Sequence, residues 1–235
     1  MGLFDLFRSK RSPAACSPTS GDTVVDADGN VYHTVHIGDQ VWTVENLKTT
    51  RYHDGTPIAL VIEASEWEDR LTEAYCWFDN DIGRKDEYGA LYNWYAVSTD
   101  RLAPPGWRVP QHADWEKLQE CLIAAGHNWD ETKEENKIAK SLAAKCGWHT
   151  DPSPGAIGND VSKNNRSGFS AVASGSRSHD GVFIDQGRIG TWWSATGTIL
   201  PSAAYIRFLR YGPDVGLCMS MGNKSWGFSV RLLKE

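Results

Sequence analysis

Residues with the chemistry of a metal site occur in two acidic stretches of the chain. The first, DADGN, supplies Asp26, Asp28 and Asn30, and the second is FDNDIGRKDE, residues 78–87. Hard oxygen ligands of this kind bind calcium. The first stretch lacks the further ligands of an EF-hand loop and has the composition of a hairpin turn. The second stretch is a weak calcium candidate, with a solvated acidic turn as the alternative. Its candidate ligands are Asp79, Asp81 and Asp86.

Residues with the chemistry of catalysis are few. Cys146 and His149, in CGWH, could serve as nucleophile and base, but a helix end followed by a turn accounts for the same letters. The chain contains no G-x-S-x-G, no H-E-x-x-H and no phosphate-binding glycine loop. Its five cysteines are odd in number and include no C-x-x-C, so they predict neither a disulfide framework nor a zinc site. We expect mostly reduced cysteines, with one bridged pair as the alternative for an exported protein. We therefore expect a protein that is not an enzyme and that uses no cofactor.

Length and composition limit the remaining classes. A chain of 235 residues can form one large domain or two small ones with a real core. The net charge of −6 provides no basic field for nucleic acid, so we expect no nucleic-acid partner. Eleven tryptophans, eight tyrosines and 22 glycines favour short strands and turns over a helical bundle.

The N-terminal segment MGLFDLFRSKRSP combines apolar and basic residues. It is too short for the apolar region of a signal peptide, and no apolar run approaches the roughly 18 residues of a transmembrane helix. We expect residues 1–20 to be a tail with a linker, or alternatively a weak membrane-surface anchor. The localisation stays open: a phage particle, or a cell surface reached by an unrecognised route.

The elements that position these residues can be read from periodicity. Residues 23–47 read as three strands joined by turns. Residues 87–99, 111–126 and 132–147 each read as a helix. Strands at both ends of a chain with helices between them predict an α+β domain whose terminal strands share a sheet. The later strands are expected at residues 168–175, 181–187, 191–196, 203–211 and 227–233.

Between the last two expected strands lies GPDVGLCMSMG, residues 212–222. It follows neither the period of a strand nor that of a helix, and we expect a loop there. Two of the three methionines of the chain lie in it, beside a cysteine. Methionine side chains repack against different partners, which suits a binding surface.

Several longer motifs occur in the order found in one known family. They are DADGNVYHTVHIGDQVWTVENL, EYGALYNWYAV, PPGWRVPQHADWEKL, NRSGFSAVASGSR, WWSAT and NKSWGFSVRLLK. The chain resembles the Fibrobacter succinogenes major paralogous domain over about Asp26 to Lys234. That family is similar to C-type-lectin-like folds. The resemblance implies an α+β, C-type-lectin-like domain over residues 21–235, with antiparallel sheets, the N- and C-terminal strands together and about two to three helices.

The chain departs from the family near its C-terminus. The frame residues of the segment are kept, but positions that the family usually fills with Asn or Tyr hold other residues. This pattern resembles the variable proteins of diversity-generating retroelements, in which adenine-directed mutagenesis rewrites such codons. The resemblance implies a variable ligand-binding region over about residues 194–226.

Strand geometry supports the same division of residues. Side chains alternate faces along a strand, so residues 206, 208, 210 and 212 share one face and the frame residues between them share the other. We expect the apolar variable residues to form an exposed patch; the alternative is that residues 217, 219 and 221 fold under the loop as a small core. The candidate ligand-binding residues are Ile199, Leu200, Ile206, Phe208, Arg210, Gly212, Pro213, Asp214, Gly216, Leu217, Met219, Met221 and Trp226.

These features predict a non-enzymatic receptor or adhesin whose C-terminal face is diversified. We expect a protein ligand, with carbohydrate as the second choice. The sugar-binding triplets Glu-Pro-Asn and Gln-Pro-Asp are absent, so a lectin-like fold does not by itself imply lectin activity. One alternative is a fixed-sequence adhesion or carbohydrate-binding module. Another is an oxidase similar to the formylglycine-generating enzymes, whose activity depends on specific cysteines near the C-terminus, a pattern that the single Cys218 does not match.

Overall fold

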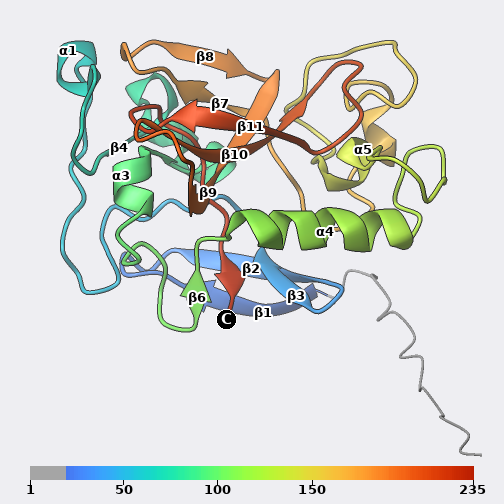
Figure 1. Cartoon of the computed structure of the whole chain (residues 1–235), viewed down its shortest axis with the longest axis horizontal. Helices are drawn as coiled ribbons and strands as arrows, with labels where there is room; N and C mark the ends of the chain where they lie inside the picture. The colour runs from blue at the N-terminus through green and yellow to red at the C-terminus, as the bar shows by residue number, and fades with distance from the viewer. Residues whose placement is uncertain (1–19) are drawn as a thin grey trace, which may run out of the picture.

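The structure is a computed structural model that describes residues 20–235 (Figure 1). The predicted tail and its membrane-surface contact lie outside the described residues. The described chain begins with β1, whose first residue is Ser20. The architecture is α+β, with mainly antiparallel sheets and few helices, as the sequence predicts.

The first sheet contains both ends of the described chain. Its order is β1-β2-β3-β12-β6, and Leu233 of β12 pairs with Trp42 of β3 on one side and with Arg108 of β6 on the other. The expected meeting of the terminal strands is therefore observed. The strands are β1 (Ser20–Val25), β2 (Val31–Ile37), β3 (Gln40–Thr43), β12 (Leu233–Lys234) and β6 (Trp107–Arg108).

The second five-stranded sheet contains most of the predicted variable region. Its order is β11-β10-β9-β7-β8, so that β11 lies at an edge. All its pairings are antiparallel except that of β7 with β9. The strands are β7 (Ser174–Arg177), β8 (Phe183–Gln186), β9 (Ile189–Gly197), β10 (Ala203–Arg210) and β11 (Cys218–Asn223). A third, two-stranded sheet joins β4 (Tyr75–Cys76) to β5 (Leu91–Tyr92).

Helix α4 (His112–Ala124) lies between the two large sheets (Figure 1). Its apolar face places Trp115 at 4.8 Å from the Trp42 ring of the first sheet and at 6.4 Å from the Trp192 ring of the second. A capping box of Gln111 and Asp114 begins the helix. The predicted helix over residues 111–126 is thus confirmed, and it joins the two sheets through one aromatic core.

The helix predicted over residues 87–99 is wrong. The segment forms α2 (Lys85–Tyr88), then β5, then α3 (Trp94–Val97). Gly89 ends α2 with a φ of 73°, and a Cβ at this position would lie 2.7 Å from Cβ of Asn46. The left-handed conformation and the close approach both require glycine. The apolar residues around Gly89 therefore have helical spacing because α2, β5 and α3 each bury some of them.

Two further expectations differ from the structure. Of residues 132–147 only α5 (Ala139–Leu142) is an α-helix, because the Asn128 side chain donates to the carbonyls of Glu134 and Glu135 and accepts from the Lys137 amide. Residues 227–232 are not a strand; residues 227–229 make single bridges to neighbouring segments. The remaining helices are single turns: α1 (Ala64–Trp67), η1 (Phe78–Asn80), η2 (Ile82–Arg84) and η3 (Val161–Lys163). The described chain thus has five short or medium α-helices, of which only α4 is longer than four residues, where about two to three helices were expected.

Two motif arginines hold irregular segments together from within the core. Arg231 is fully buried and donates to the carbonyls of Thr43, Phe169 and Ser170 and to the side chain of Asn46. Arg177, 1% exposed, donates to three other backbone carbonyls. Buried donors of this kind are tolerated when their hydrogen bonds are satisfied. These arginines are therefore structural.

Candidate functional site

The segment expected to be a loop contains a strand. Residues 218–223 form β11, which pairs antiparallel with β10 at the edge of the second sheet. Met219 lies opposite Arg207 and Met221 opposite Tyr205. The loop expectation was wrong because burial along CMSMGN does not follow hydrophobicity. Both methionines project to one side of the strand, and that side is exposed. Figure 1 shows β11 along the outside of β10.

The two methionines are exposed, but they lie on a different face from the one expected. Met219 is 50% and Met221 52% exposed. Residues directly opposite in an antiparallel pair project to the same side of the sheet. Both methionines therefore lie beside Tyr205 and Arg207, whereas Ile206 and its neighbours on the same face project to the other side. The predicted single patch is divided between two faces of one sheet.

Two members of the predicted patch are buried. Ile206 is 8% exposed and packs in a core cluster with Trp193 and Phe228. Leu217 is 2% exposed, and its backbone makes both of its hydrogen bonds with the Asn136 side chain, at 3.0 and 2.8 Å. Only this residue of the alternative small core is buried, since Met219 and Met221 remain exposed. Ile206 and Leu217 support the site from below and do not present a surface.

The two glycines of the set differ in the space around them. A Cβ on Gly216 would lie 2.6 Å from the carbonyl oxygen of Asn136, a distance that real Cβ atoms do not show. Gly212 is buried, and a Cβ there would meet Asp151 at 3.4 Å. Position 216 therefore excludes any side chain in this conformation, while position 212 admits a small one.

The polar members of the set lie at the end of β10. Arg210 and Asp214 form an exposed ion pair of 3.2 Å, and the guanidinium also lies 5.1 Å from the centre of the half-buried Phe208 ring. Exposed pairs contribute at most about 1 kcal/mol, so a ligand can separate the two charges at low cost. Pro213 is exposed beside them.

A second exposed group lies in the β9–β10 turn. Ile199 is 99% exposed and Leu200 is 47% exposed. The Lys224 amide donates to the carbonyl of Ser202 at 2.8 Å, which joins this turn to the end of β11. The exposed apolar residues of the turn and of β11 thus belong to one end of the sheet.

Trp226 is half-buried. Its ring stacks on His179 with the planes 10° apart, and it packs against Phe228 at 5.6 Å. The expected surface position is therefore only partly observed, because two rings cover much of the indole.

Sequence reasoning missed a polar group beneath the methionines. Tyr205 stacks on His112 at 4.4 Å, and His112 pairs with Glu116 at 3.2 Å. Arg207 is 4% exposed, contacts His112 Nδ1 at 3.4 Å, and its Nε has no hydrogen-bond partner among residues 20–235. Burial lowers the pKa of Arg207, with Glu116 acting in the opposite direction. No local pattern marks this group, because β10 and the first turn of α4 are about 90 residues apart in sequence and meet only through the fold.

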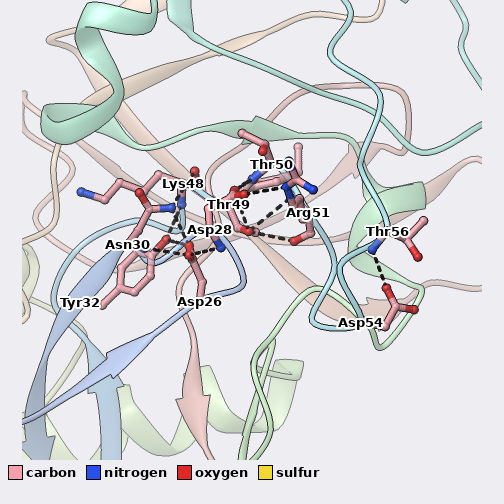
Figure 2. A network of polar contacts seen from close by, with 11 residues as sticks. Asp26, Asp28, Asn30, Tyr32, Lys48, Thr49, Thr50, Arg51, Asp54 and Thr56 are labelled. Carbon is pink, nitrogen blue, oxygen red and sulfur yellow. Dashed lines mark hydrogen bonds and ion pairs between the residues drawn. The ribbon is translucent and has the colours of Figure 1, made fainter.

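The first acidic stretch is a hairpin turn whose carboxylates bind the protein itself (Figure 2). Asp26 accepts from the backbone amides of Asp28 and Asn30 and from the Tyr32 hydroxyl. Asp28 accepts from the Thr50 amide at 2.5 Å and pairs with an arginine at 3.1 Å. Burial and the Asp26 carboxylate raise the pKa of Tyr32. The network fastens the first hairpin to the segment after β3, as expected of a structural turn.

The second acidic stretch does not assemble a calcium site. Asp81 caps η2 by accepting from the Gly83 amide, and Asp86 pairs with Lys48 at 2.7 Å. Asp79 is exposed at a positive φ of 54°. Throughout the described chain, no three histidine, cysteine or acidic residues are placed to hold a metal ion.

Cys146 and His149 do not form a nucleophile and base in the described chain. Cys146 is exposed, and in the described part of the chain no hydrogen bond joins it to His149, whose ring packs on Tyr211 at 5.8 Å. Burial raises the pKa of the Cys218 thiol, and the Asp214 carboxylate raises it further. A thiol that stays protonated at neutral pH is a weak nucleophile.

No helix among the described residues has the length and apolar character needed to cross a membrane.

Comparison with known proteins gives one match, to a protein family. No curated protein and no solved structure gives a significant match. A family model described as the Fibrobacter succinogenes major domain matches residues 35–234, which include the whole second sheet and α4 and, of the first sheet, β3, β12, β6 and the end of β2. The chain therefore belongs to the Fibrobacter succinogenes major domain family.

Proposed function

We propose that this protein is a non-enzymatic receptor or adhesin that binds a protein ligand through its C-terminal sheet edge, and that a diversity-generating retroelement varies the residues displayed there. In this proposal the domain is a variant of the C-type-lectin-like fold, carried on a phage particle or a cell surface. The ligand-contacting elements are the β9–β10 turn, the end of β10 with the following loop, and β11.

The observation that carries the proposal is an edge strand that presents two neighbouring exposed methionines. Edge strands are normally protected by charged residues, proline or bulges, because their free backbone groups invite pairing. Strand β11 has the sequence CMSMGN, without a charge or a proline. Methionine adapts its shape to different partners at a low cost. Such an edge is suited to contact with another protein surface.

The distribution of burial gives further support. Of the frame residues of β10, Ala204, Arg207 and Leu209 are at most 4% exposed and Tyr205 is half-buried. Most of the predicted variable residues are instead exposed or half-exposed, the exceptions being Ile206, Gly212 and Leu217. A surface that tolerates replacement needs this separation, because substitutions at exposed positions usually change stability by less than about 0.5 kcal/mol.

Surface display of libraries tests the proposed face. One library randomises the exposed or half-exposed positions Ile199, Leu200, Phe208, Arg210, Pro213, Asp214, Met219 and Met221. A control library randomises exposed apolar positions elsewhere, namely Val25, Val31, Leu71, Ile82 and Val182. Both are selected against the same purified probe proteins, lysozyme and streptavidin.

We expect the first library to stay folded and to yield specific binders whose affinity depends on the randomised positions. Binders that arise equally often from the control library would contradict the proposal, since the C-terminal face would then have no special capacity. A first library that is largely unfolded would also contradict it.

A further inference from the structure

The chain has an open cavity of about 610 Å³ that is lined by none of the predicted variable residues. Its walls come from the loop after α4, from α5 and from residues 154–166. Small-molecule sites have volumes of roughly 300–1,000 Å³ and combine aromatic surface with a few polar groups. The size suits a sugar-sized ligand and is too small for the surface of a folded protein.

An indole forms one wall of the cavity. Trp129 is 42% exposed, an unusual exposure for so large a ring. One side of it is fixed by Gly155, where a Cβ would lie 2.4 Å from the indole Nε1. The Trp129 amide also donates to the Lys137 carbonyl at 3.1 Å, which holds the loop in place. The ring is therefore a rigid platform that keeps a face free for stacking against the C–H face of a sugar.

The charges of the lining favour an anion. Lys140, Lys163 and Arg166 contribute cations, and Glu131 is the acid among the lining residues. Lys140 is already bound by the carbonyls of Ala156, Asn159 and Asp160, so its role is to fix the wall.

Two cationic groups remain for a ligand. Arg166 donates through Nη2 to the Gly126 carbonyl at 2.5 Å, and its other N–H groups have no partner among the described residues. Lys163 is 75% exposed and pairs with the exposed Asp160 carboxylate at 3.1 Å, a contact that a ligand can displace. Arginine binds a carboxylate with a planar pair of donors, which suits an acid group on a ring.

We propose that this cavity binds a carboxylated sugar of the uronic acid class. The pyranose ring stacks on Trp129, its carboxylate pairs with Arg166 and Lys163, and its hydroxyl groups contact Asn159 and Ser141 in the wall. The site is independent of the proposed protein-binding edge at β11. It adds a carbohydrate specificity to a domain whose C-terminal face binds protein.

Isothermal titration with matched sugars tests the proposal. The probes are D-glucuronate, D-glucose and acetate, which separate the contributions of ring and charge. We expect D-glucuronate to bind about 10- to 100-fold more tightly than D-glucose, the range expected for hydrogen bonds to a charged group. Acetate should not bind measurably, because it lacks the stacking ring.

Variants assign the binding to the cavity. Arg166→Gln and Lys163→Gln should each reduce the preference for D-glucuronate over D-glucose, and Trp129→Ala should abolish binding of both sugars. Trp129→Phe keeps an aromatic ring and should retain partial affinity if the loop is intact. Met219→Ala should leave sugar binding unchanged and so separates this site from the protein-binding edge.

Four results would overturn the proposal: no binding of D-glucuronate to the unmodified protein, equal affinity for D-glucose, equal affinity for acetate, or unchanged binding in the folded Trp129→Ala variant. Each of these leaves the proposed function at β11 unaffected.

Discussion

Replacing Leu217 by alanine should destabilise the protein strongly, while the same change at Met219, two residues away, should not. Leu217 is 2% exposed and packs in the cluster around α4, whereas Met219 is 50% exposed at the sheet edge. Truncating a buried leucine costs about 2–5 kcal/mol, because apolar contacts are lost and a cavity remains. A surface substitution changes stability by roughly 0.5 kcal/mol or less.

Urea denaturation measures the difference. For a loss near 3 kcal/mol, Leu217→Ala should lower the midpoint by about 1 M if the m value is near 3 kcal/mol/M. The same loss corresponds to a melting temperature lower by about 6–12 °C for a chain of this size. The Met219→Ala midpoint should lie within roughly 0.2 M of the unmodified protein. The m value should be equal in all three proteins, which makes the midpoints comparable.

Equal midpoints for Leu217→Ala and Met219→Ala would refute the reasoning. They would show that Leu217 is not part of the core and that the division into supporting and displayed residues is wrong. A large loss in Met219→Ala alone would mean that the methionines are buried in solution, which would remove the proposed contact surface.

Three other substitutions test interactions that stabilise the fold. Gly216→Ala should lower the melting temperature by several degrees, because the added Cβ would lie 2.6 Å from the Asn136 carbonyl oxygen; an unchanged melting curve would show that this loop moves freely. Burial raises the pKa of Asp114, but hydrogen bonds from Arg108 and from a backbone amide outweigh burial, so that the pKa is lowered overall. The Asp114 carboxylate therefore stabilises the fold above about pH 4, and this stabilisation is lost as the pH falls further. Asp114→Asn should cost about 1–3 kcal/mol at pH 7 and less at pH 3, and a loss independent of pH would contradict that assignment. Because the pKa of Tyr32 is raised in the folded state, Tyr32 contributes to the free energy of unfolding below about pH 10, and this contribution decreases at higher pH. Tyr32→Phe should therefore reduce the loss of stability with rising pH, measured by urea midpoints between about pH 9 and 11. An unchanged dependence of the midpoint on pH would contradict this origin.

Local patterns in the sequence predict elements whose burial follows a single period. Helix α4 was predicted because its buried residues recur at helical spacing over 13 residues. Strands β9 and β10 lie close to their expected places: residues 205–211 alternate as strand residues do, and β9 contains the motif WWSAT. The union of the terminal strands followed from the order of the elements, and it is seen where Leu233 pairs with Trp42.

Elements that depend on distant partners could not be predicted in this way. Strand β11 exists because β10 offers a pairing edge, although its own apolar residues, Met219 and Met221, are exposed and not buried. Leu217 is buried because Asn136, 81 residues earlier, binds its backbone. The helix expected over residues 87–99 failed because Gly89 must approach Asn46 closely.

The candidate site could be predicted only in part, because the faces of its strands depend on distant partners. The candidate residues of the β9–β10 turn and of β11, Ile199, Leu200, Met219 and Met221, are exposed, and departures from the family mark the two methionines. Which face each one occupies depends on strand register, and register is a property of the pair of strands. Arg207, His112 and Glu116 escaped prediction because they meet only when α4 packs on the second sheet.

The most direct test of the central claim is the DNA sequence of the gene and its downstream region in related isolates. The proposed function predicts a near-copy of the segment that encodes residues 192–235, differing at adenines and lying beside a reverse-transcriptase gene. It further predicts that sister copies vary at displayed positions such as Arg210, Met219 and Met221 and keep Gly216 and Leu217. The absence of such a copy, or differences spread equally over buried frame residues such as Leu209, would contradict the claim that this face is diversified.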